Sequence, residues 1–234
     1  MTTQEFSDAF DTLLNSHSNV SAYGEQSSKA DLVLDEYEKS LLLTQAQEEV
    51  VRGLYNGTLT GESFEGTEEL RRNLDSLIIT EVLKDSNAPY KGVTATSSKF
   101  YSFPEDVWYI IYEQATITGS DLCGGSSVVK VVPMRHDEWH NSSSNPFRRP
   151  NKKKVIRLDH SAGLLELVSD YSITEYLIKY LSKPTPIILT QLPEGVSIDG
   201  EQDITECQLN TALHRIILER AVQLAYKRIP QASK

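Results

Sequence analysis

The side chains best suited to metal chemistry lie in one short stretch, from His136 to His140. The two histidines are four residues apart, so on a helix both imidazoles would lie on one face. Asp137, Glu138 and the later His160 supply further possible ligands. The sequence His-Asp-Glu-Trp-His nevertheless differs from the zinc-protease motif His-Glu-x-x-His, because Asp follows the first histidine. No spacing in the chain places a third ligand.

We therefore expect a short turn after Pro133, in which Trp139 packs on a sheet and the histidines lie near the surface. A metal-dependent hydrolase that uses His136 and His140 stays as an alternative. Elemental analysis of the purified protein would distinguish the two interpretations.

Nucleophilic and nucleotide chemistry have no sequence motif here. Neither Cys123 nor Cys207 comes with a histidine at a recognisable spacing, and the chain contains no Gly-x-Ser-x-Gly, Gly-x-Gly-x-x-Gly or phosphate-loop pattern. The pair Gly124-Gly125 after Cys123 predicts a hairpin turn. The two distant cysteines indicate free thiols in a reducing compartment. We therefore expect no nucleophilic or nucleotide-binding site and no cofactor.

The strongest charge feature is a basic segment between Arg148 and Arg157. It contains six of the 23 Lys and Arg residues and no acidic residue, which leaves 17 basic residues elsewhere against 33 Asp and Glu. The net charge of −10 argues against broad coating of nucleic acid, since such binding depends on neutralising many phosphates. A DNA-binding module that uses this segment, 148–157, remains an alternative.

Two prolines frame the start of this segment, in Asn145-Pro146-Phe147-Arg148-Arg149-Pro150. Proline fixes its own φ and favours an extended residue before it, so the side chains between are partly preset. One interpretation is a solvated connection between strands. The other is an interface anchor, in which Phe147 fills an apolar pocket and Arg148 and Arg149 bind carboxylates, while Lys152, Lys153 and Lys154 hold an acidic surface.

The N-terminal third has helical periodicity. Apolar residues from Phe6 to Leu14 follow the spacing of one helix face, and Thr2 and Glu5 are spaced as a capping box. A Ser-rich stretch near 17–30 predicts a mobile arm. Thr44 predicts the cap of a helix at about 45–56, and another helix should follow Thr67.

The middle of the chain has β-type patterns separated by Pro, Gly, Asn and Ser, and we expect an antiparallel meander. The predicted strands are Leu77–Leu83, Lys99–Phe103, Val107–Ala115, Ser127–Val132, Val155–His160, Leu164–Val168, Tyr176–Leu181 and Ile187–Leu189.

A final apolar stripe, from Leu209 to Leu224 and including Ile216, predicts a C-terminal helix. The fold class is thus α+β. We expect a helical segment at 1–76, an inserted antiparallel β-domain at 77–204, and a C-terminal helix at 205–234 that packs on the N-terminal helices. We expect neither a signal peptide nor a membrane span, because no apolar run has the required length.

Several segments, taken in order, resemble virion structural proteins of crAss-like tailed bacteriophages of gut Bacteroidales. The resemblance runs from about Asp35 to Ala225. Its motifs are Asp35-Glu36-Tyr37-Glu38-Lys39-Ser40, Leu43-Thr44-Gln45-Ala46-Gln47-Glu48-Glu49, His136-Asp137-Glu138, Asn145-Pro146-Phe147-Arg148-Arg149-Pro150, Tyr180, Lys183-Pro184-Thr185-Pro186-Ile187-Ile188-Leu189, Leu213-His214-Arg215 and Glu219-Arg220-Ala221-Val222.

The resemblance implies a ring or adaptor protein of the head-to-tail connector. Such a protein would form a homo-oligomer, expected as a dodecameric ring, and would contact the portal protein and neighbouring ring or tail proteins. It would be made in the host bacterial cytoplasm and end in the virion. Genome DNA would pass through the channel without sequence-specific binding. The resemblance implies no catalysis and transfers no catalytic residue, and it leaves open which ring the protein forms.

Overall fold

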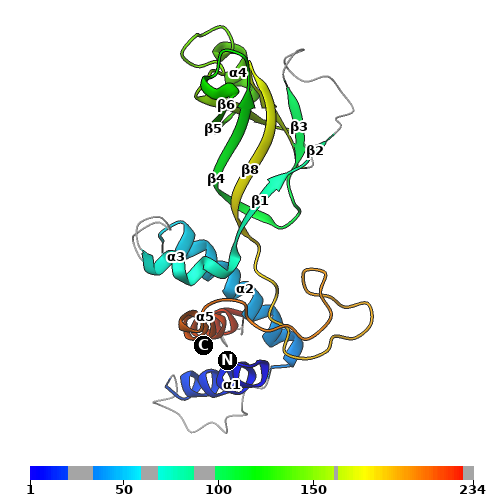
Figure 1. Cartoon of the computed structure of the whole chain (residues 1–234). Coiled ribbons are helices and arrows are strands. Elements are labelled where there is room, and N and C mark those ends of the chain that lie inside the picture. The colour runs from blue at the N-terminus through cyan, green and yellow to red at the C-terminus, as the bar shows by residue number, and fades with distance from the viewer. Residues whose placement is uncertain (21–33, 59–67, 87–97, 161–162, 229–234) are drawn as a thin grey trace. The chain divides into compact units, whose positions relative to one another are not determined.

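The computed structural model describes residues 1–20, 34–58, 68–86, 98–160 and 163–228, and the chain divides into two compact units (Figure 1). The helical unit comprises Met1–Leu77 and Lys183–Lys234, and the β-unit comprises Ile78–Ser182. Residues 183–204, which the sequence prediction assigned to the β-domain, thus group with the helices. None of the described helices is both long and apolar enough to cross a membrane.

The helical unit is built from α1 (Thr3–Val20), α2 (Glu36–Tyr55), α3 (Glu68–Leu74) with the 3-10 turn η1 (Asp75–Leu77), and α5 (Thr211–Arg228). The predicted capping box starts α1: the Thr2 backbone N–H donates to Glu5 Oε2 at 2.9 Å, and the Glu5 N–H donates to Thr2 Oγ1 at 3.3 Å. Helix α1 continues to Val20, so the start of the stretch expected to be mobile is helical. Residues 21–30 of that stretch lie outside the described part of the chain.

Helix α2 begins at Glu36 and not near residue 45, so that predicted boundary is wrong. The capping box is made by Asp35 and Glu38 instead. Thr44 lies buried in the middle of the helix, where its Oγ1 accepts the Ile187 backbone N–H at 3.1 Å. Gln47 donates to the Thr185 carbonyl at 2.7 Å. The polar side chains that suggested a helix start therefore attach the segment after Lys183 to α2.

Helix α5 packs on α2 and α1, as predicted for the C-terminal helix. Leu213, Ile217 and Ala221 are buried in this packing, whereas Ile216 is 44% exposed and does not belong to the buried face. The predicted strand 187–189 is reduced to one isolated bridge between Ile188 and Thr205. Its residues are nevertheless buried, so their apolar pattern reflects packing and not sheet formation.

The β-unit is one eight-stranded sheet in the order β1-β8-β4-β5-β6-β7-β3-β2. Only the single residue Lys84 separates β1 from β2, although they stand at opposite ends of this order, so one extended segment closes the sheet on itself. The strands are β1 (Ile78–Leu83), β2 (Asp85–Ser86), β3 (Lys99–Ser102), β4 (Val107–Thr118), β5 (Ser126–Met134), β6 (Lys154–Asp159), β7 (Leu164–Val168) and β8 (Ser172–Ser182).

The α+β class is confirmed, but the sheet is not a simple meander. Strand β8 lies between β1 and β4, and β5 pairs with β6 in parallel. A parallel pair requires a crossover connection, and α4 (His136–Ser142) lies in that connection. Trp139 of α4 packs against Ile156, Leu158 and Val168, as expected for a tryptophan packed on a sheet.

The inward face of the sheet forms the main core, and it contains one buried ion pair. The Tyr101 ring on β3 meets the Tyr176 ring on β8 edge-on at 5.1 Å, so strands near the two ends of the order face each other. Among these side chains, Arg157 Nη1 lies 2.5 Å from Glu113 Oε1, and the Tyr176 hydroxyl donates to the same carboxylate. The Glu113 carboxylate holds the pKa of Arg157 above its ordinary value despite the opposing effect of burial.

Candidate assembly interface

The basic loop, residues 144–154, lies at one end of the β-unit. The chain enters and leaves this unit where Ile78 pairs with Leu181 and Val107 with Ser182. At the other end of the same strands Thr118 pairs with Ser172, and there the β4–β5 turn meets the loop: Lys152 Nζ lies 3.0 Å from Asp121 Oδ2. The basic loop therefore lies at the end of the β-unit opposite to the end where the chain enters and leaves this unit.

Hydrogen bonds made by Asn145 define the conformation of the loop. Its carbonyl accepts the backbone N–H groups of Arg148 and Arg149, both at 3.0 Å, and its side-chain oxygen accepts the Phe147 N–H at 3.0 Å. Further on, Asn151 and Lys154 form a backbone bridge. These bonds support the predicted preset geometry and give the loop a defined shape before any partner binds.

The most exposed large apolar side chain of the described residues is Phe147, at 89%. Exposing a phenylalanine to water is costly, so a partner that covers it would gain apolar burial. The turn places Phe147 directly before two exposed arginines, Arg148 and Arg149. This is the combination of aromatic anchor and guanidinium groups found at interface hot spots.

The cations of the segment fall into two groups. Lys152 binds Asp121, and Lys154 Nζ donates to the Phe147 carbonyl at 3.0 Å, so both hold the loop together. Arg148, Arg149 and Lys153 are exposed and make no ion pair with any described residue. Of the six cations in the segment, these three are the ones without an internal partner in the part of the chain that the structure describes. Arg157, counted with the basic segment in the sequence, is buried on the inward face of β6.

No third ligand joins the histidine pair among the described residues. His136 and His140 are exposed on α4, and His136 Nε2 lies 2.9 Å from the Asp159 carbonyl oxygen. His160 contacts Glu166 Oε2 at 3.1 Å and stacks edge-on against His136. Within the described ranges, no three His, Cys, Asp or Glu side chains are arranged to hold a metal ion. The hydrolase alternative therefore has no structural support.

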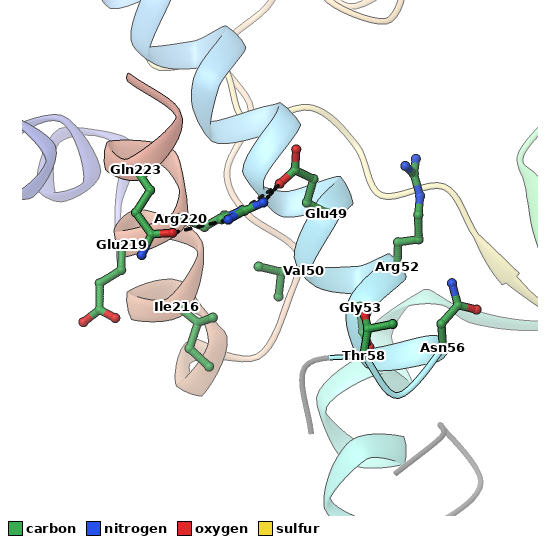
Figure 2. Close-up of a pocket in the computed structure, with 10 residues that line it drawn as sticks. All are labelled: Glu49, Val50, Arg52, Gly53, Asn56, Thr58, Ile216, Glu219, Arg220 and Gln223. Atoms are coloured by element: carbon green, nitrogen blue, oxygen red, sulfur yellow. Dashed lines mark hydrogen bonds and ion pairs between the residues drawn. The ribbon is translucent and has the colours of Figure 1, made fainter. Parts of the chain in front are cut away.

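A pocket of about 610 Å³, which the sequence did not predict, lies in the helical unit between α2 and α5 (Figure 2). Arg220 reaches from α5 to Glu49 on α2, with Nη2 2.6 Å from Oε2. Burial opposes ionisation of Glu49, but its bonds to Arg220 and Gln45 outweigh that effect and lower its pKa. Ile216 is the exposed apolar side chain that lines the pocket. The lining residues include no nucleophile with a neighbouring base, and all four charged side chains of the lining already have ion-pair partners.

The two units differ in net charge. The helical unit contains 21 Asp and Glu against 11 Lys and Arg, whereas the β-unit contains 12 of each. The whole net charge of −10 thus belongs to the helical unit. The sequence alone contrasts the basic segment only with the rest of the chain, whereas the division of the fold assigns the acidic excess to one unit.

Residues 1–233 match the family described as phage tail ring protein 3/4. The chain belongs to this family. It is 44% identical over 228 residues to Ring protein 3 of Bacteroides phage crAss001, an alignment that covers 96% of this chain and 95% of that protein. It is also 32% identical over 237 residues to Ring protein 4/5 of the same phage, covering 96% and 92%.

Membership of the phage tail ring protein 3/4 family confirms the resemblance found in the sequence. The protein is a virion ring protein of a crAss-like phage. A structural family of this kind implies a role without catalysis. In a ring protein the relevant sites are interfaces, so an exposed Phe147 among unpaired arginines is of more functional interest than the histidines of α4.

Proposed function

We propose that this phage tail ring protein forms a dodecameric ring at the portal vertex, between capsid and tail. The ring would stack on the portal protein or on a neighbouring ring, and genome DNA would pass through its channel without sequence-specific binding. Assembly would take place in the host cytoplasm. The family match over nearly the whole chain supports a ring, and the copy number and position in the connector are the proposed part.

The relatives also favour one place in the stack. Both named rings of phage crAss001 align with this chain over most of its length, but the identity to Ring protein 3 is 44% and that to Ring protein 4/5 is 32%. We therefore propose the position equivalent to Ring protein 3. A reconstruction of the virion tail that located the chain elsewhere would reject that assignment.

Within the ring, we propose that the basic loop binds an acidic partner through Phe147, Arg148, Arg149 and Lys153. The observation that carries this proposal is that these four side chains are exposed on a loop whose backbone is fixed by internal hydrogen bonds. A preset loop loses little conformational entropy on binding. Lys152 and Lys154 would contribute indirectly, by maintaining the shape of the loop.

Native mass spectrometry of the protein mixed with the portal tests the ring directly. We expect a species with twelve copies, whereas a chain that stays monomeric at every concentration and never joins portal or virion would contradict the proposal.

The alternative of DNA binding rests on the same unpaired cations. It would be favoured if duplex DNA bound with a steep salt dependence that disappeared in the variant R148A/R149A/K153A while ring formation stayed intact.

A further inference from the structure

The helical unit contains a second exposed loop whose charge is opposite to that of the basic loop. Between Lys183 and Arg215 the chain has no Lys or Arg, and residues 193–206, here called the acidic loop, contain five carboxylates. Glu194, Glu201 and Glu206 are exposed and make no ion pair with any described residue. Asp199 binds Lys183 at 2.9 Å and Asp203 accepts from Gln191 at 2.8 Å, so both have internal partners.

The acidic loop has a defined conformation. Buried Leu192 and Ile198 pack with Ile188 against Tyr37 and Leu41 of α2. Backbone hydrogen bonds close the loop at its base and near its tip. At the base the Leu192 N–H donates to the Gln202 carbonyl at 3.1 Å, and near the tip Ile198 and Glu201 bridge each other. Asp199, at φ 51°, and Gly200, at φ 89°, make the tight turn at its tip. Figure 1 shows this segment in orange, looping away from the helices.

An apolar side chain stands among these carboxylates, as Phe147 does among the arginines. Ile204 is 53% exposed and follows Asp203 directly. Each loop therefore combines an exposed apolar side chain with three unpaired charges, positive in the basic loop and negative in the acidic loop. In both, the remaining charges have internal partners, so binding would not have to break existing ion pairs.

This complementarity fits the geometry that a ring requires. In a closed ring each subunit contacts its two neighbours through two different surfaces, and the contact is repeated around the axis. Opposite charges on the two surfaces guide the subunits into register and disfavour contacts between like surfaces. The basic loop cannot bind itself, and neither can the acidic loop, so the pair favours a head-to-tail arrangement of copies.

We propose that the basic loop of one copy binds the acidic loop of the next copy, with Phe147 against Ile204 and the three unpaired cations facing Glu194, Glu201 and Glu206. This inference rests on the proposed ring and names its subunit contact. The partner of the basic loop is then a second copy of this chain and not DNA.

Charge reversal tests the contact in the intact protein. The basic-loop variant R148E/R149E/K153E and the acidic-loop variant E194K/E201K/E206K should each need at least tenfold higher concentration to assemble, measured by analytical ultracentrifugation. An equimolar mixture of the two should recover assembly, because copies can alternate so that every contact joins opposite charges. A chain carrying all six changes should also recover.

A matched control separates this effect from net charge. K84E/K130E/K179E changes three other exposed lysines of the β-unit and alters the net charge by the same amount as the basic-loop variant. We expect it to assemble like the unmodified chain. If it failed equally, or if the mixture of reversed variants did not recover, the proposed loop pairing would be overturned.

Cysteine pairing tests contact between the two apolar side chains. In a C123S background, which removes the exposed native thiol, a chain with F147C is mixed with a chain with I204C under mild oxidation. A disulfide forms readily only when the two Cα atoms come within about 7 Å. We expect a covalent dimer of the mixed chains, and none when V128C, an exposed position on β5, replaces F147C.

The results distinguish failure of the proposed ring from failure of the proposed loop pairing. An unmodified chain that never assembles, alone or with the portal, contradicts the ring itself. A chain that assembles while the reversed variants assemble equally well, or while F147C and I204C cross-link no more than the V128C control, contradicts only the pairing of the loops.

Discussion

The two units of this ring protein use charge differently. Each has a buried cation held by carboxylates: Lys39 lies 2.7 Å from Asp11 and 2.9 Å from Glu36 in the helical unit, and Arg157 contacts Glu113 in the β-unit. On the surface the units differ, since the helical unit has the acidic excess and the β-unit is neutral overall with a basic end. Buried charges therefore serve the fold of each unit, and the unpaired surface charges are available for association.

This comparison separates residues that should affect stability from residues that should affect assembly. Arg157 and Lys152 belong to the same basic segment as Arg148, yet both have internal partners. Sequence proximity thus does not assign a common role. Substitutions in the two classes should therefore have different effects.

The largest effect should come from Glu113→Ala in the β-unit. The change leaves the guanidinium of Arg157 without its nearest carboxylate and removes the acceptor of the Tyr176 hydroxyl. Removing one partner of a buried ion pair costs about 3–5 kcal/mol. In this variant the buried guanidinium keeps only the exposed Asp159 carboxylate, whose Oδ1 lies 2.8 Å from Arg157 Nε. Urea unfolding followed by circular dichroism measures this loss.

The double variant E113L/R157M provides the control. Replacing both partners by apolar side chains of similar volume removes the desolvation cost together with the attraction, so it should be clearly more stable than Glu113→Ala. Equal stability of the single variant and the unmodified chain would show that the pair contributes nothing to the β-unit.

The next largest effect should come from Trp139→Ala on α4. This side chain is 7% exposed and packs against Ile156, Leu158 and Val168, so truncation should cost about 3 kcal/mol. Helix α4 directly precedes the basic loop, so assembly should weaken as well. Trp139→Phe should retain most of both properties, and a loss of assembly without any loss of stability would contradict a packing role.

The fold could be predicted from sequence where the pattern was local. The helical and β-type periodicities gave the α+β class, the Thr2 and Glu5 capping box and most strand positions. The start of α2 could not be predicted, because two capping patterns compete in the sequence and the choice depends on bonds from Thr44 and Gln47 to residues more than 130 positions away. The parallel β5–β6 pair was missed because alternation of apolar residues does not indicate strand direction.

The candidate interface was predictable to a similar extent. The prolines, Phe147 and the basic run were evident in the sequence, and the structure shows them on an ordered, exposed loop. The sequence could not separate the internally bound Lys152 from the unpaired Lys153, because that difference depends on Asp121 in a distant turn. The acidic loop could have been found, since the absence of Lys and Arg between 183 and 215 is a sequence signal.

The variant R148A/R149A should have a smaller effect, and it should change the free energy of assembly more than that of unfolding. Stability should stay within about 0.5 kcal/mol, because exposed side chains without partners rarely contribute to folding. Assembly should weaken about tenfold, which corresponds to about 1.4 kcal/mol. K130A/K179A removes the same charge from the sheet surface and should leave assembly unchanged, as sedimentation would show. Loss of stability in the arginine variant would indicate a structural role for the loop.

The smallest effect concerns pH and the helical unit. Burial lowers the pKa of His214 below its ordinary value of 6.5, although its bond to the Leu209 carbonyl acts in the opposite direction. The unfolded chain therefore takes up a proton near pH 6.5 while the folded chain does not. The contribution of neutral His214 to stability is complete above that pH and decreases as the pH falls from 6.5 through the lowered pKa. His214→Gln keeps a donor for the carbonyl but does not titrate, so its unfolding free energy should fall less between pH 7 and 5.5. Parallel pH profiles for the two proteins would show that His214 does not contribute to this dependence.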